Sequence, residues 1–256
     1  MNPKLVRATL VIGILILAGA GCQTRTAGTS TVPTIPGLPS VAVTSPCEHP
    51  YYPLKPGYEI AYQTKWGTNV SNYSEKVTAG GSDSVQLHLA FDGGTTSDQT
   101  IQCRDGKLQV MGYVDVASAT QSKRANVTTK SVEGDFLPKD LRVGSEWTNK
   151  FEIEMDMSQI AAGGLNKVEG TITTQRKVLG EEEVTVPAGT FKALKIQAET
   201  AIDTHLPGVA NGVTASIPKL VTTEWWVKGK GMVKSVMSMG AGQGDNTSEA
   251  TRIVVP

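Results

Sequence analysis

The stretch Val85-Gln86-Leu87-His88-Leu89-Ala90-Phe91 decides the fold class, because every second side chain in it is large and apolar. Successive side chains of a β-strand point to opposite faces of a sheet, so this alternation is typical of a strand with one buried face. The same period of two recurs at residues 58–62, 147–155, 190–204 and 221–228. The sequence therefore predicts a mainly β fold built from half-buried antiparallel strands.

Short turn signals separate these strands and favour hairpins and meanders over long crossovers. The signals are Gly80-Gly81, Gly93-Gly94, Asp105-Gly106, Pro187-Ala188-Gly189, Gly229-Lys230-Gly231 and the glycine-rich residues 240–244. We expect at most one short helix, at residues 156–165. A composition rich in Thr, Val, Ser and Gly agrees with a β-dominated domain.

One seven-residue pattern occurs twice in the chain. Leu54-Lys55-Pro56-Gly57-Tyr58-Glu59-Ile60 matches Leu141-Arg142-Val143-Gly144-Ser145-Glu146-Trp147 as leucine, base, any residue, glycine, any residue, glutamate and an apolar residue. Each copy predicts a tight turn that leads into an alternating strand. Two interpretations stay open: coincidence between two such turns, or a domain made of two related β-halves.

The N-terminus carries an export signal. Lys4 and Arg7 precede an apolar run at residues 8–17. Small residues at 18–21 then lead to Cys22. A basic start, a short apolar core and a small-residue exit are typical of a secretory signal peptide. The run is shorter than the roughly 20 residues that a spanning helix needs. We therefore predict a signal peptide at residues 1–21 and an extracytoplasmic location.

Residues 17–22 resemble the lipobox of bacterial lipoproteins. The resemblance implies that the Cys22 thiol is diacylated and that cleavage occurs just before it, which makes a lipid-anchored membrane protein. Gly19 departs from the pattern, since leucine is usual there. In the alternative interpretation residues 18–20 form an A-x-A cleavage site, and cutting after Ala20 leaves a soluble protein.

Residues 23–46 predict a disordered tether, because they are rich in Thr, Ser and Pro and hold almost no side chain suited to a core. A coil of this length spans roughly 25–30 Å. We expect one β-rich globular domain at residues 47–256. If Cys22 carries lipid, Cys47 and Cys103 remain as an even pair, which in an oxidising compartment indicates a disulfide. The alternative is two unpaired buried cysteines.

The sequence shows no catalytic, metal-binding or cofactor motif. The chain has 24 basic and 24 acidic residues, so its formal net charge is zero and no basic stripe suggests nucleic acid. His49, His88 and His205 have no neighbours at metal-ligand spacing, and no CxxC or HExxH is present. We predict no catalytic residue, no metal and no cofactor.

Two segments resemble hairpins of a known group. Residues 186–191 read V-P-A-G-T-F, and residues 225–234 have the form W-x-x-x-G-x-G-x-V-K. Over residues 51–256 the chain is similar to the TapB-like group of exported bacterial domains of unknown function. The resemblance implies a curved, largely antiparallel sheet or half-open β-barrel that is often lipid-anchored. It implies no active site, because its motifs are turns and strand cores.

Adjacent tryptophans offer a candidate binding surface. If Trp225 points into the core, Trp226 lies on the polar face beside Glu224 and Lys228. An exposed large aromatic side chain can mark a binding surface, and Met232 and Met237 nearby could line an adaptable apolar groove. The alternative is that another strand or loop covers Trp226.

Several functions fit these observations. The leading hypothesis is a non-enzymatic, lipid-tethered β-domain that binds an apolar ligand or a protein partner at the cell envelope. An enclosed apolar cavity would favour the ligand, and a filled core would favour an interaction or structural role. The alternatives are a purely structural envelope lipoprotein and a hydrolase of envelope polymers. The hydrolase would need carboxylates such as Asp92, Glu146 and Glu224 to converge in one cleft.

Overall fold

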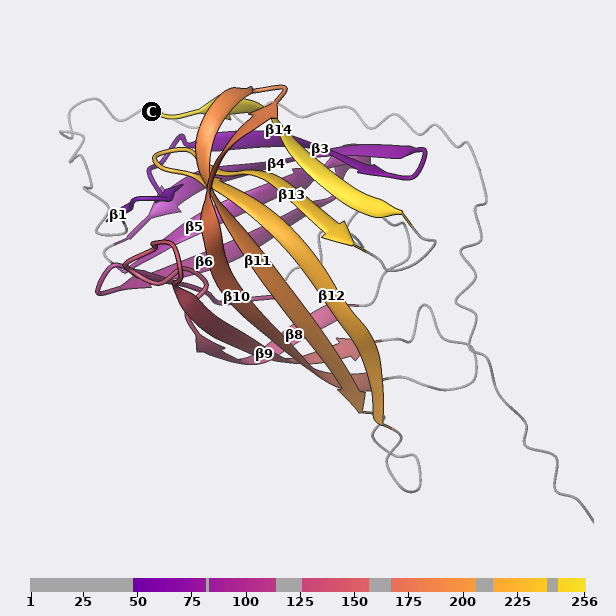
Figure 1. Ribbon diagram of the computed structural model, residues 1–256. Helices are drawn as coiled ribbons and strands as arrows, with labels where there is room; N and C mark the ends of the chain where they lie inside the picture. The colour runs from indigo at the N-terminus through magenta and orange to yellow at the C-terminus, as the bar shows by residue number, and fades with distance from the viewer. Residues whose placement is uncertain (1–47, 82, 114–125, 157–166, 206–213, 239–243) are drawn as a thin grey trace, which may run out of the picture. The chain divides into compact units, whose positions relative to one another are not determined.

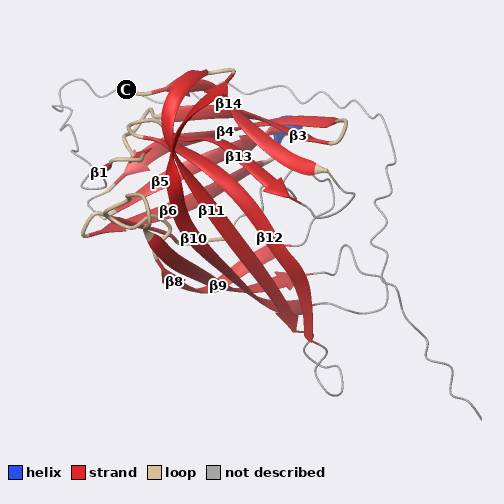
Figure 2. Cartoon of the chain, viewed as in Figure 1, coloured by secondary structure: helices blue, strands red, loops and turns tan. Residues whose placement is uncertain are grey.

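The protein is described by a computed structural model that covers residues 48–81, 83–113, 126–156, 167–205, 214–238 and 244–256 (Figure 1). Residues Ala42–Pro256 form one compact unit. The described residues form strands and no α-helix, with one 3-10 turn at Asp92–Gly94, which confirms the mainly β prediction (Figure 2). Within this part of the chain we find no helix long and apolar enough to cross a bilayer. The helix expected at residues 156–165 lies outside the described residues except for Asp156, which ends a strand.

The strands of the described residues belong to two sheets. Strands β1 (Glu48–His49) and β2 (Tyr52–Pro53) form a small hairpin sheet. The large sheet contains β3 (Glu59–Trp66), β4 (Asn69–Gly80), β5 (Ser84–Phe91), β6 (Thr96–Arg104), β7 (Lys107–Val110), β8 (Asn126–Gly134), β9 (Glu146–Asp156), β10 (Lys167–Val186), β11 (Gly189–His205), β12 (Thr214–Val227), β13 (Gly231–Ser238) and β14 (Asp245–Val254).

The large sheet is antiparallel throughout and curls into a nearly closed barrel. Its order is β7-β6-β5-β4-β3-β14-β13-β12-β11-β10-β9-β8. The two edges meet through Leu108 of β7 and Leu137, which follows β8, where the Leu108 amide donates to the Leu137 carbonyl at 2.9 Å. The curved sheet or half-open barrel that the resemblance implied is therefore confirmed.

The strand order divides the sheet into two halves of six strands. The first half runs β7-β6-β5-β4-β3-β14, and the second runs β13-β12-β11-β10-β9-β8. Strands β3 to β7 correspond in order to strands β9 to β13. The last strand of the chain, β14, takes the place beside β3 that β8 takes beside β9.

The two copies of the sequence pattern open these halves with the same hydrogen bonds. The Gly57 amide donates to the Val77 carbonyl at 3.1 Å, and the Gly144 amide donates to the Val178 carbonyl at 2.9 Å. Both glycines have a positive φ, of 92° and 85°, which glycine adopts without steric cost. A bulge follows each valine in its strand. The two copies of the pattern therefore occupy equivalent places in two halves of similar strand order, as the interpretation of two β-halves expects.

The barrel has one packed end and one loop end. At the packed end the β1–β2 hairpin lies against the turns that contain Pro138 and Gly229, and it buries Tyr52 and Leu54 beside Tyr58. At the loop end β7, β9, β11 and β13 end at Val110, Asp156, His205 and Ser238, and most of the residues that connect them to the next strands lie outside the described residues. The core is therefore best defined at the packed end.

Candidate functional site

An ion pair lies on the inner face of the sheet. The strand register places β9, β10, β11 and β12 side by side there. The Arg176 Nε lies 3.6 Å from Glu224 Oε1, and the two side chains are about nine-tenths buried. Arg176 also donates from Nη1 to Asn149 Oδ1 at 2.5 Å, and Glu224 Oε2 accepts from Trp226 Nε1 at 2.8 Å. Buried charges are costly unless they are paired and hydrogen-bonded, so this network links β9, β10 and β12 across the intervening β11.

Aromatic rings fill the space next to this ion pair. The rings of Tyr52 and Phe136 each lie 5.9 Å from Trp226 in edge-on contact. The Arg176 guanidinium lies over Phe136 at 5.4 Å. Edge-on ring pairs and cation–π contacts add to the stabilisation from buried area. The interior at the packed end is therefore occupied by side chains of the protein itself.

A second acidic side chain, Glu75, faces the interior from β4. Its Oε2 accepts a hydrogen bond from the Tyr52 hydroxyl at 3.2 Å, and Tyr58, Tyr62 and Tyr73 surround it. No ion pair joins Glu75 to a cationic side chain within the described residues. Burial raises the pKa of this carboxyl to about 7, and the hydrogen bond from Tyr52 opposes the shift. Glu75 is therefore a proton-binding group near neutral pH.

The orientation expected for the two tryptophans is reversed. Trp226 is only 3% exposed and belongs to the core, so it forms no open binding surface. Trp225 lies on the outer face, where its Nε1 donates to Glu182 Oε1 at 2.7 Å. The expectation placed Glu224 outward because it is charged, but its ion pair with Arg176 turns it inward and Trp226 with it. The alternative prediction, in which other parts of the protein cover Trp226, agrees with the structure.

The two methionines of the predicted surface are half-buried on β13. Met232 is opposite Trp226 in the strand ladder, and its carbonyl accepts from the Tyr62 hydroxyl at 2.7 Å. Met237 is opposite Thr222, five residues further along the strand. Met232 packs against the core, so a role for the pair in binding remains a prediction.

The cysteines and histidines lie in separate places. Cys22 and Cys47 fall outside the described residues, and Cys103 is buried on β6. His49 is buried at the packed end, while His88 bonds Asp98 on the surface at 2.7 Å. The described ranges contain no group of three or more His, Cys, Asp or Glu residues placed to hold a metal ion.

The three carboxylates proposed for a hydrolase have different partners on different elements. Asp92 accepts from the Asn72 amide at 2.6 Å, Glu146 pairs with Lys177 at 2.6 Å, and Glu224 belongs to the interior ion pair. General acid–base cleavage needs two such groups to flank one bond. The fold does not bring these three groups into one cleft.

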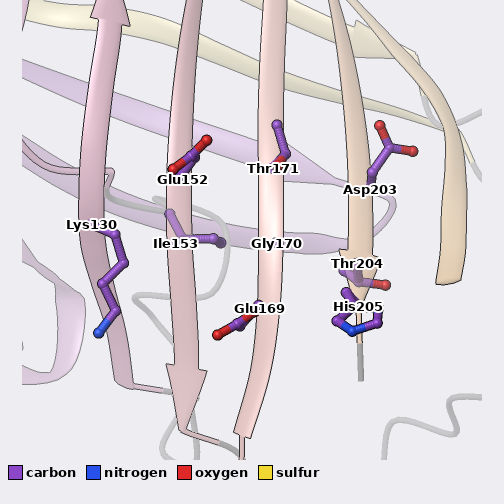
Figure 3. A pocket seen from close by; sticks show the side chains of 9 residues that line it. All are labelled: Lys130, Glu152, Ile153, Glu169, Gly170, Thr171, Asp203, Thr204 and His205. Carbon is purple, nitrogen blue, oxygen red and sulfur yellow. The ribbon is translucent and has the colours of Figure 1, made fainter. Parts of the chain in front are cut away.

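A shallow polar depression of about 320 Å³ lies on β8 to β11 toward the loop end (Figure 3). Glu152, Thr171 and Asp203 are direct neighbours in one row across three strands, and Glu169 and His205 form the next row. Gly170 lies between the rows and lines the depression. Hydrogen bonds from Lys150 and Ser131 keep the pKa of the Glu152 carboxyl below its usual value. The depression therefore presents the ionised Glu152 carboxylate to solvent.

Sequence reasoning missed Glu75, Arg176 and Asn149. A signal for the first two exists, since Glu75 stands between Tyr73 and Val77 at the period of two, in a strand that the sequence analysis did not identify. Arg176 likewise stands two residues before a buried valine. A charged residue at an inward position of an alternating strand indicates a buried polar network. Its partner across the sheet cannot be read from spacing.

Comparison with solved structures shows the same fold in exported proteins. A protein from Bacteroides fragilis, described as exported and of YmcC-like fold, aligns with a TM-score of 0.53 and 16% identity over 80% of this chain and 99% of its own. A protein from Parabacteroides distasonis, described as a lipoprotein, aligns with the same TM-score and identity over 80% of this chain and 98% of its own. No curated protein matches the chain.

A family model also matches the chain directly. It covers residues 92–243, which run from the end of β5 through β13 and include the ion pair and the polar depression. This match covers more than half of the sequence. The chain belongs to the DUF3108-like family, a family of domains of unknown function.

Proposed function

We propose that the protein is a non-enzymatic lipoprotein, anchored through Cys22 on the extracytoplasmic side of a membrane, whose β-domain binds a protein partner. We choose a partner over an apolar ligand because side chains fill the described interior at the packed end. Ligand-carrying barrels enclose an apolar cavity, whereas here Tyr52, Phe136 and Trp226 occupy the space beside the buried ion pair. The resemblance to the TapB-like group stays a prediction beside the family match.

The polar depression supplies the surface for this partner. Its row of Glu152, Thr171 and Asp203 crosses three neighbouring strands. Polar side chains fixed on a sheet present a defined pattern of hydrogen-bond acceptors, which favours specificity over tight apolar packing. A partner segment with lysine or arginine side chains fits this pattern best.

Photo-crosslinking in cells tests the partner surface. A crosslinking amino acid replaces Thr171, and in a control protein it replaces the exposed Lys76 of β4. We expect a discrete covalent adduct from position 171 that is absent from position 76. An equal pattern at both positions, or adducts at neither, would contradict this surface.

Native mass spectrometry separates the partner from the ligand hypothesis. We expect the purified full-length mature protein to show its own mass with no bound hydrophobic molecule. A bound molecule that solvent extraction removes would contradict the partner hypothesis. It would instead support binding of an apolar ligand, the other target named in the leading hypothesis.

The lipid anchor has an independent test. Globomycin, which blocks the lipoprotein signal peptidase, should cause the precursor to accumulate, and a labelled fatty acid should mark the native protein but not Cys22→Ser. Normal processing in globomycin together with an unlabelled native protein would remove the anchor from the proposal and leave the soluble alternative with cleavage after Ala20.

A further inference from the structure

The β1–β2 hairpin is a separate sheet held in place by contacts at the packed end. Its ladder has only two residue pairs, Glu48 with Pro53 and His49 with Tyr52. A two-stranded ribbon this short is not stable in water on its own. The Gly229 amide donates to the Pro50 carbonyl at 2.7 Å, and the Tyr52 hydroxyl donates to Glu75. The position of the hairpin therefore depends on a few hydrogen bonds and on the packing of Tyr52 against the core.

His49 makes two of these bonds, and its partners fix its protonation. The Tyr51 backbone N–H can only donate, so His49 Nδ1, at 3.2 Å, must accept. The Pro138 carbonyl can only accept, so His49 Nε2, at 3.0 Å, must carry the hydrogen. Both ring nitrogens are thus used by the neutral imidazole. Because the residue is only 5% exposed, bulk water does not replace a lost partner.

Protonation of His49 breaks this arrangement. The imidazolium carries hydrogens on both nitrogens, so Nδ1–H would point at the Tyr51 N–H. One hydrogen bond is lost and two donors face each other in a buried place, which costs free energy. The bond to Pro138 would persist, but it cannot compensate for the buried charge.

We propose that His49 is an acid-sensitive latch, whose protonation releases the β1–β2 hairpin and uncovers the aromatic surface formed by Tyr58, Phe136 and Trp226 beneath Tyr52. This regulatory role does not depend on the partner surface proposed above. The hairpin follows directly on residues 1–47, so the latch sits where the chain enters the barrel.

The direction of the effect follows from the electrostatics. Burial lowers the pKa of His49 below its ordinary value of 6.5, and the bond to Pro138 opposes this. The released hairpin then binds the proton more readily than the seated one. Stability of the seated hairpin is complete above the ordinary value and is lost as the pH falls through the lowered pKa.

Other titratable groups on the packed elements must be separated from His49. They are Tyr51 in the hairpin, Glu181 and Lys192 of β10 and β11, Lys139 and Asp140 after Pro138, Lys228 and Lys230 around Gly229, and Glu75 beneath Tyr52. Glu181 and Lys192 neutralise each other as an ion pair at 2.5 Å. Glu75 responds in the opposite sense, since acid favours its buried neutral form. Loss of the hairpin on acidification therefore points to His49.

Amide hydrogen exchange of the full-length mature protein tests the latch. Between about pH 7.5 and about pH 5, after correction for intrinsic exchange rates, protection of the Gly229 amide should fall by up to about tenfold per pH unit. Protection of the Ile196 amide, deep in β11, should not change. In His49→Gln the side chain still donates and accepts but cannot become charged, so protection should no longer depend on pH. The matched control His88→Gln should behave like the native protein.

Two results would overturn the latch. One is unchanged protection at Gly229 in the native protein across this range. The other is a His49→Gln protein that loses protection with acid as the native protein does. Should His49→Gln fail to fold, the NMR titration of the native imidazole decides: His49 must titrate together with the loss of protection at Gly229, and titration without that loss refutes the proposal.

Discussion

Glu75 and Arg176 occupy equivalent positions in the two halves of the sheet, each two residues before the valine that precedes a bulge. Each is also paired in the ladder with the last residue of its sequence pattern, Ile60 for Glu75 and Trp147 for Arg176. The two halves thus place opposite charges at the same point of the interior. Only Arg176 has an ionic partner there, in Glu224, so the two positions should respond differently to pH and to substitution.

Replacement of Glu75 should stabilise the protein at neutral and alkaline pH. The pKa of Glu75 is about 7 in the folded protein against 4.5 for an ordinary glutamate, so the folded state loses stability as the pH rises from 4.5 to 7. Glu75→Gln keeps an acceptor for Tyr52 and removes the charge. Because the side chain is half-buried, we expect a gain of about 2 kcal/mol above pH 7 in urea unfolding, and almost none near pH 4.5. An equal effect at both pH values would contradict the raised pKa.

Loss of one member of the interior ion pair should be far more damaging than loss of both charges. Arg176→Ala leaves Glu224 buried with no compensating charge, and we expect it to lower the free energy of unfolding by about 3–5 kcal/mol. The double variant Arg176→Met with Glu224→Gln removes both charges, retains an acceptor for Trp226, and should recover at least half of that loss. Urea unfolding monitored by tryptophan fluorescence measures both. A double variant as unstable as Arg176→Ala would show that packing, and not charge, holds these strands.

Two glycines with similar backbone angles form a matched pair. Gly134 and Gly144 have φ values of 77° and 85°. A Cβ at Gly134 would overlap the backbone carbonyl of Thr148, whereas one at Gly144 would have no neighbour within 4 Å. Gly144→Ala should therefore cost only backbone strain, about 1 kcal/mol, and Gly134→Ala about 3 kcal/mol or more. Thermal unfolding of the two variants compares them, and equal losses would argue against the close approach of β8 and β9.

The predicted disulfide can be checked by chemistry. In protein prepared from an oxidising compartment and unfolded in urea, Cys47 and Cys103 should stay unmodified by iodoacetamide until reductant is added. Replacement of both cysteines by serine should lower the free energy of unfolding by about 4 kcal/mol in the loop-entropy model. Alkylation of both thiols without reductant would support the alternative of two unpaired cysteines.

The sequence predicts the class of fold well, because alternation and turns are local signals. Val85 to Phe91 identifies a strand by itself, and the pattern around Gly57 and Gly144 reveals the two halves. Strand order is not local: nothing near Asp245 indicates that β14 lies between β3 and β13. Such pairings depend on the packing of the whole chain.

The candidate site was harder to predict than the fold, and for a physical reason. Polarity assigned Glu224 to the outer face, and the assignment of Trp226 followed from it. That rule fails where a distant charge, here Arg176, 48 positions earlier in the sequence, pairs with the residue inside the core. The depression on β8 to β11 arises in the same way, from the side chains of four strands around Gly170.

The place of β14 has a consequence for how the molecule assembles. A ribosome delivers the chain from its N-terminus, so β3 to β7 emerge first with the edge of β3 bare. That edge stays open until the final strand of ten residues has been made. Unpaired strand edges and late, non-local pairing slow folding and promote aggregation. The edge of β3 is therefore open to wrong pairing until β14 has been made.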